Sequence, residues 1–248
     1  MARASASAFR RALVGTLTPM LAPFVVPLLA NDAVVRDVVR SLRKVAPAVT
    51  GMLLDHLVDP EADPRVRRRI PRILKVCRSQ RAATGLLLGL RDPVFDVRLQ
   101  IGIALTHLAE DTSIKLERDA VLDLAVHELT TGRTTWAVTV EADQPSSGEA
   151  DPPSKPDASG LRRGLAHVFA VLGLVLEREP LSIAYRALRS EDPNLRGTAF
   201  EYLEVALPAR VRELLLPLID NMKPATRDRE SDGTIFSLGS FPPMVRAF

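Results

Sequence analysis

Apolar residues recur along most of the chain at helical spacing, in pairs of segments that are separated by short polar turns. In residues 192–208, DPNLRGTAFEYLEVALP, an Asp-Pro turn is followed by an apolar residue, an arginine and a half-apolar run. Three other stretches show a similar arrangement when they are aligned on one arginine, and the aligned positions are Arg36, Arg67, Arg98 and Arg196. The first two intervals are 31 residues each, without a gap. A fixed period of this length is typical of repeat architectures.

The positions around the aligned arginine are mostly apolar. One position before it stand Val35, Val66, Val97 and Leu195. Three positions after it stand Val39, Ile70, Ile101 and Ala199, and seven positions after it stand Arg43, Leu74, Leu105 and Leu203. These offsets share one face of a helix, so each unit is predicted to be a short apolar helix, a tight turn and a second helix. One such hairpin cannot bury its apolar face alone, and neighbouring hairpins are expected to stack.

The turns contain residues that start helices. We expect Asp32, Asp63 and Asp192 to cap the second helix of a unit by accepting from its free backbone N–H groups. Pro64 and Pro193 then occupy the first helical position, where the missing N–H costs nothing. The expected helical segments are 6–30, 33–45, 48–58, 64–78, 80–90, 94–109, 115–132, 161–179, 180–190, 193–206 and 208–220.

These features resemble the HEAT-repeat family, whose units pair two antiparallel helices with Asp-Pro in the turn and Val-Arg at the start of the second helix. The resemblance covers most of residues 20–220 and implies an all-α fold, an α-solenoid of about five HEAT-type helical hairpins. It also implies a ladder between turn aspartates and helix arginines, in which Asp63 belongs with Arg67 and Asp192 with Arg196. The predicted ladder residues are Asp63, Arg67, Arg98, Asp192 and Arg196.

A narrower resemblance covers residues 172–219, which are similar to the soluble HEAT-repeat region behind the membrane part of some bacterial nucleotide-translocase-like transporters. The multi-helix membrane part of those transporters is absent from this sequence. The resemblance therefore implies a free-standing or auxiliary relative and does not imply transport.

The predicted organisation is a solenoid over residues 1–220 followed by an irregular tail, residues 221–248, which has no helical period. Residues 137–160 are rich in Pro, Ser, Gly and acid and cannot build a core, so they are predicted to form a mobile loop. Residues 12–30 contain no charge and follow two arginines. They are either a signal or membrane-anchoring segment or a buried first pair of helices, and their three prolines favour the second interpretation.

The bulk composition fits packed helices in a reducing compartment. Apolar residues make up 46% of the chain but aromatic residues only 4%, so its core must consist of Leu, Val, Ala and Ile. A single cysteine, Cys77, excludes an internal disulfide framework and a thiolate zinc cluster, and it is expected to be a small core residue. We expect a cytoplasmic protein, with the inner face of the membrane as the alternative.

The sequence contains no reaction-centre motif. GxxxxGK[ST], GxGxxG, GxSxG and HExxH are all absent, and the four histidines stand in separate expected helices. Asp123 and His127 are one turn apart, a spacing that permits a catalytic dyad but favours a surface pair. We therefore predict no enzyme activity, no metal, no cofactor and no small-molecule substrate. The alternative is a HEAT-like enzyme acting on alkylated DNA bases, which the single tryptophan, Trp136 beside the loop, disfavours.

Positive charge gathers in the first part of the chain. Residues 1–110 contain 17 Lys/Arg and 9 Asp/Glu, a net charge of +8, whereas the net charge of residues 111–248 is −5. Residues 65–81, RVRRRIPRILKVCRSQR, contain eight basic residues and no acidic one. The side chains that fall opposite the apolar face of this helix are Arg65, Arg68, Arg69, Arg72 and Lys75.

A strip of one sign attracts anions such as acidic proteins, membrane surfaces or nucleic acid, and Arg65, Arg68, Arg72 and Lys75 are the predicted binding residues. The alternative is a solvated face that only keeps the helix soluble. The predicted function is a non-enzymatic binding or scaffold module that presents a curved helical surface to a macromolecular partner, above all another protein. The narrower resemblance adds the possibility of association with a membrane transporter.

Overall fold

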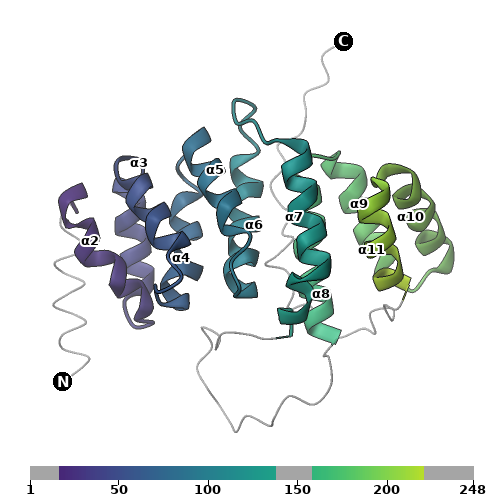
Figure 1. Ribbon diagram of the computed structural model, residues 1–248, viewed down its shortest axis with the longest axis horizontal. Helices are drawn as coiled ribbons and strands as arrows, with labels where there is room; N and C mark the ends of the chain where they lie inside the picture. Colours follow the sequence, from purple (N-terminus) through teal and green to yellow (C-terminus); the bar gives the residue numbers. More distant parts are fainter. Residues whose placement is uncertain (1–16, 138–157, 221–248) are drawn as a thin grey trace, which may run out of the picture.

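A computed structural model of the chain describes residues 17–137 and 158–220 (Figure 1). Every regular element in these two ranges is a helix, so the predicted all-α class is confirmed for the described residues. The helices lie side by side in one elongated row, with α2 at one end and α10 at the other (Figure 1). The predicted tail, residues 221–248, and most of the predicted loop, residues 138–157, lie outside the described residues.

The chain enters the row through three short helical pieces, η1 (Pro19–Leu21), α2 (Ala22–Val25) and η2 (Val26–Ala30). The sequence predicted one helical region ending at residue 30, and the structure divides its described part. Each piece has a proline at its first or second position. Because proline lacks a backbone N–H and clashes with the preceding turn, a continuous helix cannot form across these residues.

Helix α3 (Val35–Val58) joins the two helices that were expected on either side of Pro47. The joint is a kink, because Val49 has φ −116° and ψ 16° and leaves the helical region. The Thr50 hydroxyl donates to the Ala46 carbonyl at 2.9 Å, which satisfies an acceptor beside the kink. The two helices expected here are therefore one element with a bend.

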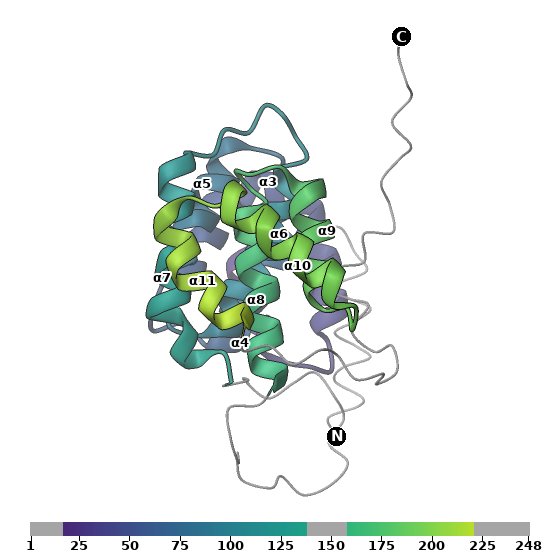
Figure 2. The same cartoon turned by 90° about the vertical axis from the view of Figure 1, so that its right-hand side faces the viewer.

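The remaining helices follow with short connections. They are α4 (Pro64–Leu74), α5 (Gln80–Gly89), α6 (Phe95–Leu108), α7 (Arg118–Thr130), η3 (Gly132–Thr135), α8 (Ala158–Leu172), α9 (Arg178–Leu188), α10 (Pro193–Ala206) and α11 (Ala209–Asp220). The helices pack in the pairs α3 with α4, α5 with α6, α7 with α8 and α9 with α10. Successive pairs contact through α3 on α5, α4 on α6 and α6 on α8. Helix α11 packs mainly on α7, and it lies with α10 at the C-terminal end of the row (Figure 2).

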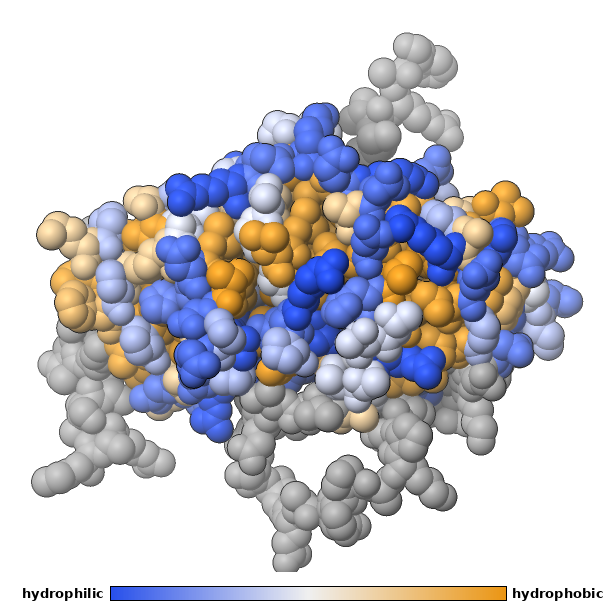
Figure 3. Space-filling view, viewed as in Figure 1, coloured by the Kyte–Doolittle hydropathy of each residue, from blue (hydrophilic) through white to orange (hydrophobic). Residues whose placement is uncertain are grey.

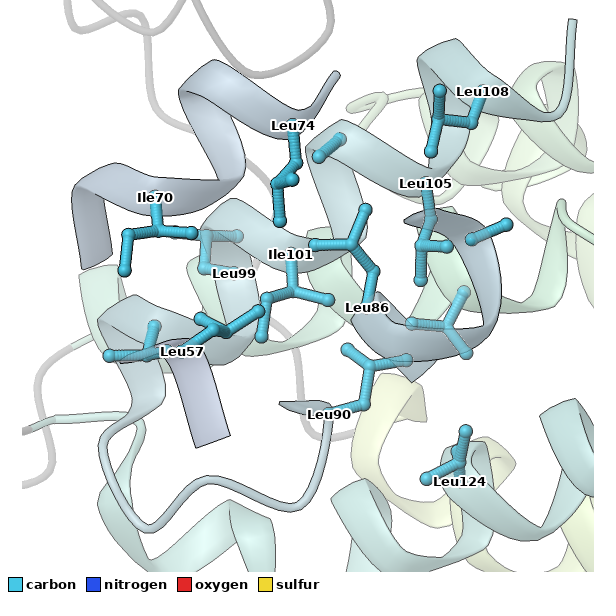
Figure 4. Packing of buried hydrophobic residues seen from close by; sticks show 14 of the residues in the cluster. Leu57, Ile70, Leu74, Leu86, Leu90, Leu99, Ile101, Leu105, Leu108 and Leu124 are labelled. Carbon is cyan, nitrogen blue, oxygen red and sulfur yellow. The ribbon is translucent and has the colours of Figure 1, made fainter. Parts of the chain in front are cut away.

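One continuous apolar core runs between the helices. Figure 4 shows side chains of α3, α4, α5 and α6 meeting in it. The aligned apolar positions of the two central units are buried, namely Val66, Ile70, Leu74, Val97, Ile101 and Leu105. Cys77 is also buried, as predicted for a small core residue. The helical periodicity therefore identified the core face of α4 and α6 correctly.

Two of the three predicted caps are present. The Asp63 carboxylate accepts from the backbone N–H of Arg65 at 2.7 Å, and Asp192 accepts from Asn194 at 2.9 Å. The cap predicted at Asp32 is wrong, because Val34 occupies the N-cap position of α3. The Asp32 carboxylate instead accepts from a buried arginine of α4, and this tertiary bond replaces the local one.

Candidate binding surface

Buried arginines connect successive hairpins. Arg67 of α4 donates to Asp92 in the turn before α6 at 2.5 Å, and both side chains are buried. Arg98 of α6 donates from Nε and NH2 to Glu128 of α7 at 2.7 and 3.0 Å. Burial raises the pKa of Asp92, although Val94 and Arg67 favour its charged form. The arginine at the repeat position thus reaches an acid of the following hairpin.

The partners in this ladder differ from the predicted ones. Arg67 is paired with Asp92 and not with Asp63, because the Asp63 carboxylate caps the first turn of its own helix. Asp192 likewise caps α10, and Arg196 is half-exposed one turn further on. At α4, the capping aspartate, Asp63, and the aspartate that pairs with Arg67, Asp92, are therefore two different residues.

Two arginines of the predicted basic strip lie inside the molecule. Arg69 is fully buried and donates to the Leu29 carbonyl and to Asp32, which ties η2 to α4. Arg68 is also buried, and its NH1 lies 3.7 Å from a carboxylate oxygen of Asp96 on α6. The prediction that Arg68 lies on an exposed strip is therefore wrong. Helix α6 packs on α4 and covers this side of it.

The other three predicted binding residues remain at the surface. Arg65 is exposed, and Arg72 and Lys75 are half-buried. Arg43 of α3 joins them, because its Nε and NH2 donate to the Arg72 carbonyl oxygen at 2.9 and 2.8 Å. Burial lowers the pKa of Lys75, and the adjacent charges of Arg43 and Arg72 lower it further. Three cations therefore stand at close quarters across α3 and α4.

The same side of α3 extends this cluster. Arg36, Arg40 and Lys44 are exposed there, and the only acid among residues 33–54, Asp37, lies 3.5 Å from Arg40. No acidic residue occurs between residues 64 and 91, so α4 and α5 contain none. We name this surface the α3/α4 basic face, and it consists of Arg36, Arg40, Arg43, Lys44, Arg65, Arg72 and Lys75.

A second polar cluster lies buried between α6, α7 and α8. Glu128 accepts from Arg98 and from the indole N–H of Trp136, the latter at 2.5 Å, and His167 Nε2 lies 3.6 Å away. Burial by itself raises the pKa of Glu128, but the neighbouring His167 and the charged hydrogen bonds of Arg98 outweigh it and hold the pKa well below the usual range. The residues are 1–3% exposed, so this cluster connects helices and offers no open site.

Sequence reasoning did not find this cluster, because nothing local marks its members. Glu128 occupies a position on α7 with no turn motif beside it, and His167 follows a long insertion. The possible Asp123–His127 dyad is not formed, since Asp123 pairs with Arg210 of α11. No cluster of three metal-ligating side chains occurs within residues 17–137 and 158–220.

Comparison of the chain with protein-family models, with curated proteins and with solved structures gave no match in any of the three. None of the helices in the described part of the chain combines the length and the apolar character that a bilayer crossing requires.

Proposed function

We propose that the chain is a non-enzymatic binding or scaffold module, built as an α-solenoid of HEAT-type helical hairpins, that acts in the cytoplasm on a macromolecular partner. The observation that supports this most is the α3/α4 basic face, where Arg43, Arg72 and Lys75 gather on two packed helices. The partner is a protein with an acidic surface. Its binding would neutralise like charges that the fold holds together.

The order of helices supports the solenoid. Pairs of helices follow one another along the chain, and Arg67 and Arg98 each form a buried ion pair with an acid of the next pair. A row of this kind offers a long surface whose shape is fixed by the contacts between neighbouring units. The mechanism of such a module is complementarity of shape and charge, with electrostatic attraction accelerating the encounter.

One observation disfavours an enzyme that acts on DNA bases. Trp136, the single tryptophan, is buried and donates to Glu128, so its ring is not a platform on which a flipped base could stack. Release of free base from alkylated DNA by the purified chain would nevertheless overturn the proposal in favour of the enzyme.

The proposal is tested with the triple variant Arg65→Glu/Arg72→Glu/Lys75→Glu. Arg68 is left unchanged, because its substitution would break a buried ion pair and confuse folding with binding. A matched control reverses three exposed charges outside the basic face and is Lys115→Glu/Arg133→Glu/Arg186→Glu. Helical content by circular dichroism should be the same for all three chains.

Affinity purification from native cells would identify the proteins that elute with the wild type, and their affinity for the purified chains would then be measured directly. We expect the triple variant to lose binding while the control keeps it, and we expect the wild-type affinity to fall with rising salt. Equal binding by the triple variant would show that the basic face is only a solvated surface.

A further inference from the structure

The N-terminal end of the row has an apolar outer surface. Met20 is 85% exposed, Phe24 77% and Leu21 50%. Residues 19–30, PMLAPFVVPLLA, contain no polar side chain at all. Figure 3 shows hydrophobic residues at the end of the molecule where α2 lies. The outer face of a terminal unit is ordinarily polar, because no further unit covers it. We call Met20, Leu21 and Phe24 the apolar tip.

The segment that carries the apolar tip is packed against the core. Ala22, Val25, Val26 and Leu29 turn inward and are buried in the core. The three helical pieces pack on α3, and η2 packs on α4 as well. The buried guanidinium of Arg69 holds the Leu29 carbonyl and Asp32. The exposed side chains are therefore presented in one place by an ordered part of the fold.

The helix that supports the apolar tip carries exposed cations. Arg36, Arg40 and Lys44 are exposed on α3, the helix against which η1, α2 and η2 pack. The first acidic residue of the chain is Asp32, and its carboxylate is engaged by Arg69. This end of the molecule therefore combines large apolar side chains with positive charge on the adjoining helix. The only acid among residues 33–54 is Asp37, which lies 3.5 Å from Arg40.

We propose that this end of the molecule docks on an anionic lipid bilayer, with the apolar tip at the boundary of the acyl chains and Arg36, Arg40 and Lys44 on the headgroup phosphates. Large apolar side chains beside basic ones are the combination that holds peripheral proteins in the membrane interface. A second copy on the same patch would bring these cations against their own equivalents. A nucleic acid would bind the cations but would not bury the aliphatic side chains of Met20 and Leu21.

This inference shares Arg36, Arg40 and Lys44 with the α3/α4 basic face of the proposed function, but the apolar tip takes no part in that function. Variants of Met20 and Phe24 therefore test the lipid proposal separately. The full chain is mixed with vesicles of phosphatidylcholine alone and with vesicles that contain one quarter phosphatidylglycerol, and flotation measures binding. The wild type should float with the anionic vesicles only. The variant Met20→Ser/Phe24→Ser should bind at least about ten-fold more weakly, because two large apolar side chains are no longer available to transfer from water into the bilayer.

The matched control for the apolar tip is Leu88→Ser on α5, which removes an exposed apolar side chain elsewhere in the molecule and should leave flotation unchanged. The contribution of the cations is tested with Arg36→Gln/Arg40→Gln/Lys44→Gln. We expect the affinity for anionic vesicles to fall roughly five-fold for each charge removed. Both test variants should keep the wild-type thermal midpoint, because the altered side chains are exposed.

Insertion is observed directly with Phe24→Trp. The native Trp136 is buried and contributes a constant background, so a blue shift on addition of anionic vesicles reports the new side chain alone. Quenching by brominated lipid should follow the same titration. Wild-type emission should not change.

Undiminished flotation of Met20→Ser/Phe24→Ser, or equal flotation with neutral vesicles, would overturn the proposal. The proposal would also be overturned if the wild type did not bind vesicles but formed a concentration-dependent dimer, or bound nucleic acid, and Met20→Ser/Phe24→Ser abolished that interaction. Partner capture by Met20→Ser/Phe24→Ser should stay at the wild-type level, whereas Arg65→Glu/Arg72→Glu/Lys75→Glu should lose it. Failure of one proposal is therefore visible independently of the other.

Discussion

Helices α6 and α10 resemble each other in sequence, yet their arginines end in different surroundings. Asp192 caps α10, whereas the N-cap residue of α6 is Val94. Both follow a turn that contains Asp-Pro, and both place an arginine directly after an apolar residue. In α6, Val97 is fully buried and Arg98 is 2% exposed. In α10, Leu195 is 50% exposed and Arg196 is half-exposed. The same local pattern therefore produces a core position in one hairpin and a surface position in the other.

The difference comes from the helix that packs next. Helix α6 lies between α4 and α8 and also contacts α5, whereas α10 packs chiefly on α9 and has only a small contact with α11. A helix with a neighbour on each side buries its first turn, and its arginine must then be paired inside the molecule. A helix at the end of the row leaves the corresponding turn to solvent. Stacking, and not the motif, decides burial.

The largest effect is expected for a carboxylate at the buried position. Val97→Asp loses the burial of an apolar side chain and places an uncompensated charge in the core, which together cost about 5 kcal/mol or more. Because total stability is about 5–15 kcal/mol, the packing of α4, α6 and α8 should be lost. Leu195→Asp should cost below about 1 kcal/mol. Urea denaturation followed by circular dichroism compares the two, and equal losses would contradict the contrast.

The next largest loss of stability is expected for the buried, ion-paired Arg98. Arg98→Ala leaves Glu128 buried without its main cation and should cost about 3–5 kcal/mol. Arg98→Lys keeps the charge but loses the two-pronged geometry, so its cost should fall between wild type and Arg98→Ala. Arg196→Ala should cost about 1 kcal/mol or less, because its side chain is partly solvated. Thermal melting of the three variants provides the ranking, and a large loss for Arg196→Ala would show that α10 is packed like α6.

Acid should weaken the buried cluster selectively. The pKa of Glu128 lies below its value of about 4.3 in the unfolded chain, so unfolded chains take up the proton first as the pH falls. The resulting stabilisation is complete above that unfolded value and is lost on acidification below it. We expect the denaturation midpoint of the wild type to fall between about pH 5 and 3. Glu128→Gln should remove part of this fall, and an unchanged slope would exclude Glu128 as its source.

The smallest loss of stability is expected for the capping aspartates, and it should be the same at α4 and at α10. Asp63 and Asp192 make equivalent capping bonds at the starts of α4 and α10. Replacement of either by alanine should cost about 1 kcal/mol, because one orphan N–H loses its acceptor. Near-equal shifts in the denaturation midpoint would show that capping is local and independent of stacking. A loss at Asp63 several times larger would mean that it also takes part in the ladder.

Much of the fold could be predicted because its causes are local. Helical spacing of apolar residues located the core face of α4 and α6, and the Asp-Pro turns located the starts of α4 and α10. The candidate site was predicted only in part. Arg65, Arg72 and Lys75 are at the surface, but Arg68 is buried. A helical wheel identifies the side opposite the apolar stripe, but it cannot show that a neighbouring helix packs against part of that side.

Arg43 was missed as a member of the basic face for a related reason. It stands in a repeat column that otherwise contains only leucine, and only the packing of α3 on α4 brings its guanidinium to the Arg72 carbonyl. The Asp32–Arg69 and Arg67–Asp92 pairs likewise join residues that are 37 and 25 positions apart. No pattern within one helix contains that information.

The amino-acid order by itself determined the helices of the central units, their apolar stripes and the caps at Asp63 and Asp192, since these depend on contacts within a few residues. Only the tertiary structure decided which arginines are buried, which acids they meet and where positive charge is left at the surface. The physical reason is that a cation can be sequestered only with a partner, and that partner belongs to the neighbouring hairpin.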